Sequence, residues 1–341
     1  MRPRRGLAAF LVSLLLSIAL LAYLLSRIEL ADLVRTFTGV YVPSLGAYAT
    51  LSLAGVALRA WRYRLLIGPE RIGPGAIVLV TLVRNLFIDL LPAKVGSLSY
   101  IYLLVRRFAL PLEVAASTFV LAAVFDALAL GPLLLVAIAM VGLGRTVLST
   151  TEFALVAAGF LLLLVVLLLA LPALLRLGLR VGERVLRAAR LAGRPGIVYL
   201  VDKVRGTIEA VEAIQRRGIY WSVFGVSFLL RLAKYASLYF VLHALLANQG
   251  FPLATLSFWK VVLGVAGAEF SANLPIQGLA GVGTWETAFA LAFRLMGYEE
   301  RIAIVAGLGL HLITQLFEYA LGAVALVLLG LSEPRRRPGP A

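Results

Sequence analysis

The stretch NLPIQGLAGVGTWE, Asn273–Glu286, interrupts a region of the chain that is otherwise apolar. It contains one proline, three glycines, the amide of Gln277 and the carboxylate of Glu286. Irregular backbone at membrane depth is costly unless it is buried in protein or lines a water-filled cavity. The stretch is therefore either a surface loop or part of a transport site, and a second stretch, LPAKVGSLSY at 91–100, resembles it.

The composition is that of a membrane protein. Of the 341 residues 62% are hydrophobic, the mean hydropathy is +0.98, and apolar runs of roughly 20 residues recur. These continuous runs predict an all-α, polytopic membrane protein forming one integral domain over residues 1–341. The net charge of +15 comes from basic residues between the apolar runs, which favours cytoplasmic loops over a nucleic-acid partner. With no cysteine and two histidines, we expect no metal site and no cofactor.

The apolar runs predict six full spans and two re-entrant or broken helical hairpins. The predicted spans are residues 6–26, 40–59, 111–144, 152–175, 220–246 and 302–331, and the predicted hairpins are residues 76–107 and 251–293. Residues 176–218 read as a basic, amphipathic cytoplasmic segment that attracts anionic lipid headgroups. Residues 332–341 read as a disordered tail.

The end of the second predicted span carries aromatic and basic residues together. Arg59, Trp61, Arg62, Tyr63 and Arg64 follow one another there, which is the pattern of an interfacial anchor. The alternative is that these side chains hold anionic headgroups. Counting Lys and Arg in the loops places both termini on the cytoplasmic side of the membrane.

The two hairpins predict an inverted repeat. Leu91-Pro92 and Leu274-Pro275 each precede a glycine-containing turn, and each hairpin leads into a long span with an acid, Asp126 or Glu318. The repeats are residues 76–143 and 252–331, and the charge rule gives them opposite orientations. Such interrupted segments at matching places indicate a binding site at the repeat interface. The alternative is chance recurrence in a leucine-rich chain.

Charged residues inside the apolar regions define the candidate site. Each would cost about 2.5–3.5 kcal/mol at the bilayer centre, so they must pair with one another or line a hydrated cavity. For substrate binding we select Arg84, Lys94, Arg231, Lys234, Gln277, Gly278, Gly281 and Gly283. For a proton or charge relay we select Asp89, Asp126, Glu269, Glu286, His311 and Glu318. In the last predicted span, His311, Gln315 and Glu318 follow one another at i, i+4 and i+7, so they share one side of a helix.

No hydrolase or nucleotide motif accompanies these charges. G-x-S-x-G, H-E-x-x-H and G-x-x-x-x-G-K are all missing from the sequence, so neither proteolysis nor ATP hydrolysis is indicated. Glycine-rich turns offer backbone N–H groups to anions, and Arg and Lys bind phosphate. These parts suit a carrier of an anionic, lipid-linked substrate better than an enzyme.

The paired motifs LLPAKVGSLSYIYLLVRR and LPIQGLAGVGTWE, each leading into an acid-bearing helix, resemble the flippase-like transmembrane domain of lysylphosphatidylglycerol synthetases. The resemblance covers about Leu7 to Leu331. It implies that the protein moves a polar-headed lipid between the leaflets of a bacterial or archaeal cytoplasmic membrane. In two-domain members a soluble domain makes that lipid, and we expect this chain to act without one. The expected activity is therefore that of a flippase acting on a phospholipid or polyprenyl-linked lipid. The alternatives are a membrane-embedded lipid-modifying enzyme and a non-catalytic partner of a separate glycosyl- or acyltransferase.

Overall fold

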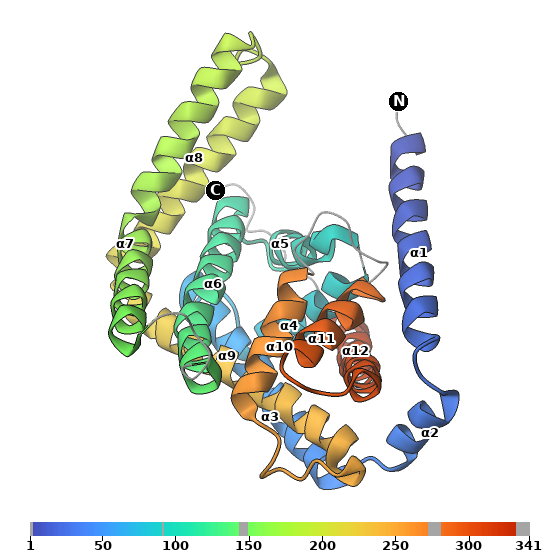
Figure 1. The fold of residues 1–341 in the computed structure, drawn as a ribbon. Coiled ribbons are helices and arrows are strands. Elements are labelled where there is room, and N and C mark those ends of the chain that lie inside the picture. Colours follow the sequence, from blue (N-terminus) through green and yellow to red (C-terminus); the bar gives the residue numbers. More distant parts are fainter. Residues whose placement is uncertain (1–2, 91, 143–148, 272–280, 332–341) are drawn as a thin grey trace.

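The computed structural model describes residues 3–90, 92–142, 149–271 and 281–331, and every regular element in them is helical. Figure 1 shows their arrangement. The α-helices are α1 (Pro3–Leu25), α2 (Leu30–Thr38), α3 (Val42–Ile67), α4 (Pro74–Leu90), α5 (Ser99–Arg106), α6 (Leu112–Gly142), α7 (Thr150–Ala188), α8 (Pro195–Arg216), α9 (Tyr220–Leu246), α10 (Phe258–Ser271), α11 (Thr284–Leu295) and α12 (Glu300–Leu331). The 3₁₀ helices are η1 (Pro92–Leu98) and η2 (Ala247–Gln249). The all-helical prediction is confirmed.

Four described helices are long and apolar enough to cross a membrane, namely α6, α7, α9 and α12. A fifth span arises if α1 and α2 count as one, although they meet at 85°. The chain is thus a multi-pass membrane protein with four to five apolar spans in its described part, fewer than the six predicted. Helix α3 has the required length, but Arg59, Arg62 and Arg64 make its second half polar.

Several predicted boundaries differ from the structure, among them the end of the second span, which was predicted at residue 59 and lies at Ile67. The predicted loop after α1 contains α2, where the Glu29 N–H donates to the Asp32 carboxylate at 3.1 Å and so closes the first turn. The predicted end of a span at residue 175 lies inside α7, which continues to Ala188; no proline occurs between Pro172 and Pro195 to end it earlier. In contrast, the predicted limits of α9 are those observed.

Helix packing places residues 42–142 against residues 220–331. Helix α3 packs along α9, α4 packs against α12, and α10 packs against α6. Each short pair, α4 with α5 and α10 with α11, also packs against the long helix that follows it. One hydrophobic core comes mainly from α3 to α6 and the other mainly from α9 to α12. Polar side chains between these two cores are therefore enclosed by protein.

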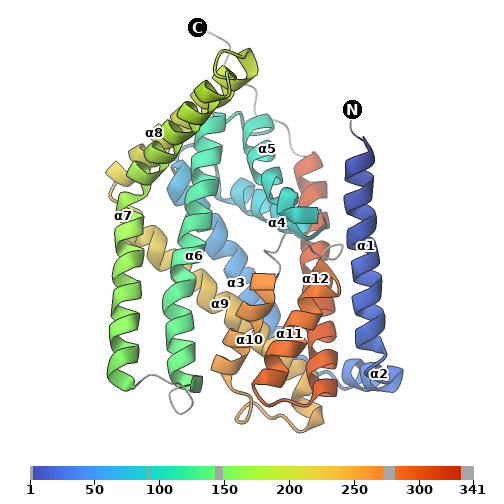
Figure 2. The same ribbon diagram turned by 45° about the horizontal axis from the view of Figure 1, so that its top comes forward.

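Helices α7 and α8 form a hairpin that extends beyond the rest of the bundle. Figure 2 shows this hairpin at the same end as the start of α1 and the end of α12. Helix α7 has 39 residues, so it is about 58 Å long, roughly twice the thickness of the hydrocarbon core. It contains Pro172, and both ribbon views show it bending between its apolar first part and its basic second part. The basic part therefore lies beyond the apolar part of the helix.

Candidate functional site

An arginine on α3 and an aspartate on α6 form an ion pair inside the bundle. Nη1 and Nη2 of Arg62 donate to the two carboxylate oxygens of Asp126 at 2.7 and 3.2 Å, and Nη1 also donates to Ser227 Oγ of α9 at 3.1 Å. Arg62 is fully buried. The prediction that Arg62 is an interfacial anchor is therefore wrong: the residue points into the bundle, where a carboxylate and a hydroxyl replace its hydration.

A second group of charges joins α9 to α10. Arg231 Nη1 and the Tyr235 hydroxyl each donate to Glu269 Oε2 at 3.2 Å, and Lys234 forms an ion pair with Glu269 Oε1. Arg231 Nε also donates to the backbone carbonyl of Asp126 at 3.2 Å. The structure therefore brings together four of the selected residues, Arg231, Lys234, Glu269 and Asp126, and Arg231 connects the two ion pairs.

Two further arginines converge on a neutral amide. Arg59 Nη1 and Arg84 Nη1 donate to Asn85 Oδ1 at 2.7 and 3.3 Å. Asn85 is 5% exposed, and the buried Nε atoms of Arg62 and Arg84 have no hydrogen-bond partner among the described atoms. We call these residues together the central cluster. Its members are Arg59, Arg62, Arg84, Asn85, Asp126, Ser227, Arg231, Lys234, Tyr235 and Glu269.

The central cluster carries more positive than negative charge. Its cations are Arg59, Arg62, Arg84, Arg231 and Lys234, and its carboxylates are Asp126 and Glu269. Among the described side chains, five positive charges thus face two negative charges. Enclosed cations in excess repel one another unless an anion joins them, so the cluster is suited to hold one.

A separate chain of hydrogen bonds connects α11 and α12. The Gly283 N–H donates to Glu286 Oε2 at 2.8 Å, and Glu286 Oε1 lies 2.5 Å from His311 Nδ1. Gln315 Nε2 lies 2.5 Å from His311 Nε2, and the Tyr319 hydroxyl donates to Gln315 Oε1. With Gln315 as donor to Nε2, the neutral imidazole carries its proton on Nδ1 and donates it to Glu286. From Tyr319 through Gln315 and His311 to Glu286, each side chain thus donates its hydrogen bond to the next one.

This chain borders a pocket of about 270 Å³ between α1–α2 and α11–α12. Glu286, His311 and Gln315 are its polar lining, and the rest is apolar: Leu21, Leu25, Leu33, Phe37, Val282, Leu308 and Leu312. The central cluster, by contrast, is built on α3, α4, α6, α9 and α10. The selected residues therefore form two groups on different helices.

The predicted substrate-binding glycines have other surroundings. Gly283 has φ +85°, and a Cβ there would lie 2.9 Å from Leu20 Cβ and 3.2 Å from the Ser17 carbonyl of α1. Because its N–H is bound by Glu286, Gly283 serves helix packing and the start of α11. Gly281 has φ +77° and open space around it. Gln277 and Gly278 lie outside the described residues, as do the side chains of Asp89 and Lys94.

Glu318 stands apart from the central cluster. It lies on the same stripe of α12 as His311 and Gln315, at the predicted helical spacing, and interacts electrostatically with Tyr48 of α3. Lys260, another of the intramembrane charges, donates to the Met296 carbonyl at 3.1 Å and so ties α10 to the end of α11. Neither residue contributes a described contact to the central cluster.

Arg84 was predicted from the sequence, and Arg59 and Arg62 were offered as headgroup-binding residues only as the alternative to an interfacial anchor. Asn85, Ser227 and Tyr235 were missed. A signal for the arginines was present. The segment LRAWRY at 58–63 and the segment LRLAKY at 230–235 share Leu, Arg, a second basic residue and Tyr at the same spacing. The two segments lie on α3 and α9, which pack against each other. Recognising this repeat would have placed all four basic residues at one site.

The helical bundle and its enclosed charges define a class: multi-pass α-helical membrane proteins with a polar interior site. Within that class, the chain matches the family described as "Lysylphosphatidylglycerol synthase TM region" over residues 10–322. Because the match spans most of the chain, the protein belongs to this family, as its motifs predicted. Comparisons with curated proteins and with solved structures gave no match. The family associates the protein with a membrane-lipid function.

Proposed function

We propose that the protein moves a polar-headed lipid between the leaflets of the cytoplasmic membrane. The observation that carries the proposal is the central cluster, in which five cations and two carboxylates lie partly buried between two packed halves of a membrane protein. A charged headgroup needs such a polar environment while its tails stay in lipid. Phe270, which follows Glu269, is 72% exposed, so apolar surface adjoins the charges.

Helix packing supports an inverted repeat in an enlarged form, with units of residues 42–142 and 220–331. Each unit has a long helix, two short helices and a second long helix. If the two units are exchanged, α3 takes the place of α9, α4 that of α10 and α6 that of α12. The α4–α12 contact then becomes the α10–α6 contact, and the α3–α9 contact stays the same. The central cluster then lies at the interface of the units, where transporters built from such repeats bind their substrates.

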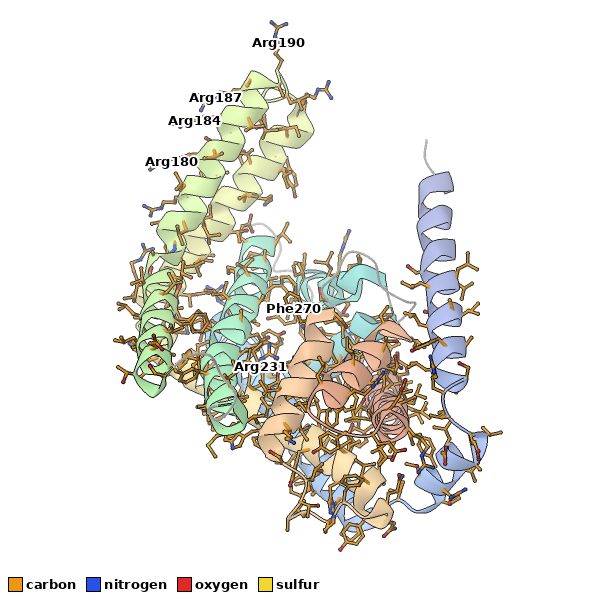
Figure 3. The ribbon with its side chains drawn as sticks, in the orientation of Figure 1. Arg180, Arg184, Arg187, Arg190, Arg231 and Phe270 are labelled. Carbon is orange, nitrogen blue, oxygen red and sulfur yellow. The ribbon has the colours of Figure 1, made fainter. Side chains whose placement is uncertain are left out.

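The arginines of the α7–α8 hairpin support an anionic membrane surface as a second partner. Figure 3 shows Arg180, Arg184 and Arg187 along the extending part of α7 and Arg190 at the tip of the hairpin, whereas Arg231 lies within the bundle. None of these four has an ion pair among the described residues, and exposed apolar side chains, such as Leu177 and Val181, accompany them. This amphipathic pattern suits the headgroup region of the cytoplasmic leaflet, and it agrees with cytoplasmic termini.

The proposal is tested with purified protein in liposomes that contain a fluorescent lipid. A membrane-impermeant quencher added outside reports how fast the inner-leaflet lipid becomes accessible. We expect faster exchange than in protein-free liposomes for at least one of three probes: an anionic phospholipid, a cationic aminoacylated phospholipid or a polyprenyl phosphate. Exchange equal to that of protein-free liposomes for all three would refute the transport function.

A further inference from the structure

The repeated segments on α3 and α9 each place one arginine against a polar side chain of the following short helix. In each segment the arginine, Arg59 or Arg231, donates to a side chain on the short helix that follows. The acceptor is Asn85 on α4 in one half and Glu269 on α10 in the other. In each half a second cation shares this acceptor, but it comes from a different helix: Arg84 lies on α4, whereas Lys234 lies on α9. Arg62, which stands in α3 where Lys234 stands in α9, binds Asp126 instead.

The two halves differ in the charge of the acceptor. Arg231 and Lys234 share the carboxylate of Glu269, which leaves a net charge of about one there. Arg59 and Arg84 share the Oδ1 of Asn85, a neutral acceptor that cancels no charge. The nearby carboxylate of Asp126 is bound by both terminal nitrogens of Arg62. Among the described side chains, the positive charge without a carboxylate hydrogen-bond partner is therefore concentrated at Arg59 and Arg84.

The free hydrogen-bonding capacity of Arg84 also favours an anion site beside these two arginines. Arg59 and Arg84 are partly buried, so an unpaired guanidinium there carries a desolvation cost. The buried Nε of Arg84 has no hydrogen-bond partner among the described atoms. A guanidinium binds a tetrahedral oxyanion through two parallel N–H groups, and two adjacent guanidiniums bind one such anion better than a single one.

We propose that Arg59 and Arg84 form a phosphate-binding site, with Asn85 holding the two guanidiniums side by side. This inference rests on the proposed function, in which the bound group is the phosphate of a lipid headgroup. Free phosphate has the same chemistry. Asn85 orients the arginines without neutralising them, and this explains why an amide stands where the other half of the site has a carboxylate.

The decisive variant is Asn85→Asp, which changes one group and keeps the size of the side chain. It supplies an internal carboxylate to both arginines, so the ligand-free protein should unfold at a higher temperature than wild type. Phosphate binding should fall by about tenfold to hundredfold, because the new carboxylate cancels part of the positive charge that attracts the anion. Loss of binding together with increased stability cannot result from misfolding. Arg59→Gln is the second variant and should also weaken binding.

Binding is measured by calorimetry on the full chain in detergent micelles with three probes: inorganic phosphate, dihexanoyl phosphatidic acid and dihexanoylglycerol. We expect both phosphate-bearing probes to bind to wild type and to lose affinity in both variants, while dihexanoylglycerol does not bind. Binding of phosphatidic acid alone assigns the site to lipid headgroups, and binding of inorganic phosphate alone overturns that lipid assignment. Unchanged affinity in Asn85→Asp, equal binding of dihexanoylglycerol, or no binding of any probe overturns the site.

The two proposals fail in distinguishable ways. If wild type moves lipid across liposomes and Asn85→Asp leaves phosphate affinity unchanged, the transport function stands and the phosphate site is wrong. If phosphate binds and Asn85→Asp removes that binding, but no lipid crosses faster than in protein-free liposomes, the site stands and the transport function is wrong.

Discussion

Arginine occurs in two contrasting environments in this protein. In the central cluster, Arg62 is fully buried and its terminal nitrogens bind one carboxylate and one hydroxyl at defined distances. On the α7–α8 hairpin, Arg180, Arg184 and Arg187 are exposed and have no ion pair among the described residues. Figure 3 shows the hairpin arginines spread along the helix, away from the bundle that contains Arg231.

The difference shows how one residue type serves two purposes. A buried charge depends on particular partners, because losing a partner leaves the other charge without compensation. An exposed charge acts through the summed field of its neighbours, and salt screens it. Each substitution in the cluster should therefore have a large and specific effect, whereas each substitution on the hairpin should have a small effect that adds to the others.

The largest expected effect is on stability. Arg62→Ala should lower the free energy of unfolding by about 3–5 kcal/mol, because it leaves the carboxylate of Asp126 enclosed without its partner. Arg184→Ala removes the same side chain from an exposed position and should change that energy by less than about 0.5 kcal/mol. Unfolding in detergent, followed by circular dichroism, measures both. Equal shifts would contradict the contrast between the two environments.

The double variant Arg62→Met with Asp126→Leu separates pairing from packing. Replacing both partners of a buried pair by apolar residues is often neutral or stabilising, so this variant should recover most of the stability lost in Arg62→Ala. If the double variant is as unstable as the single one, the loss comes from packing around Arg62 and not from an unpaired charge.

The next effect is on transport. Arg231→Gln should slow lipid exchange in liposomes by about tenfold, equivalent to about 1.4 kcal/mol in the barrier, because Arg231 connects Glu269 to the backbone of Asp126. Lys234 still pairs with Glu269 in this variant, which keeps the carboxylate compensated. Arg187→Gln is the matched control, and we expect it to change the rate by less than twofold. Similar slowing in both variants would place the transport site outside the cluster.

The sequence predicted the helical class, the break after α4 and the exact limits of α9, because these depend on hydropathy and on local breakers. It also placed Asp126, Glu269 and Arg231 correctly inside the protein, since charges in apolar runs must be enclosed. It failed for Arg62, because an anchor at a span end and a buried cation in a helix have the same local composition. Which side of α3 faces α9 is decided by contacts between distant segments.

The Glu286 chain shows the same limit. Helical spacing correctly placed His311 and Gln315 on one side of α12, because that depends only on helix geometry. It could not show that Glu286 meets His311 across two helices instead of joining Arg231 and Lys234. The single predicted site is therefore two groups in the structure, the central cluster and the Glu286 chain. Only the central cluster has the excess positive charge that suits an anion.

The smallest expected effect is that of one hairpin arginine on contact with the membrane surface. Because the chain has no cysteine, Tyr199→Cys accepts an environment-sensitive dye at an exposed position on α8. In anionic nanodiscs the emission should shift to the blue relative to zwitterionic nanodiscs, and salt should reverse the shift. Adding Arg184→Gln should weaken this contact by about 1 kcal/mol, or roughly fivefold. Arg184→Lys keeps the charge and should not weaken the contact. An equal blue shift in zwitterionic nanodiscs would show that apolar burial alone holds the hairpin at the membrane surface.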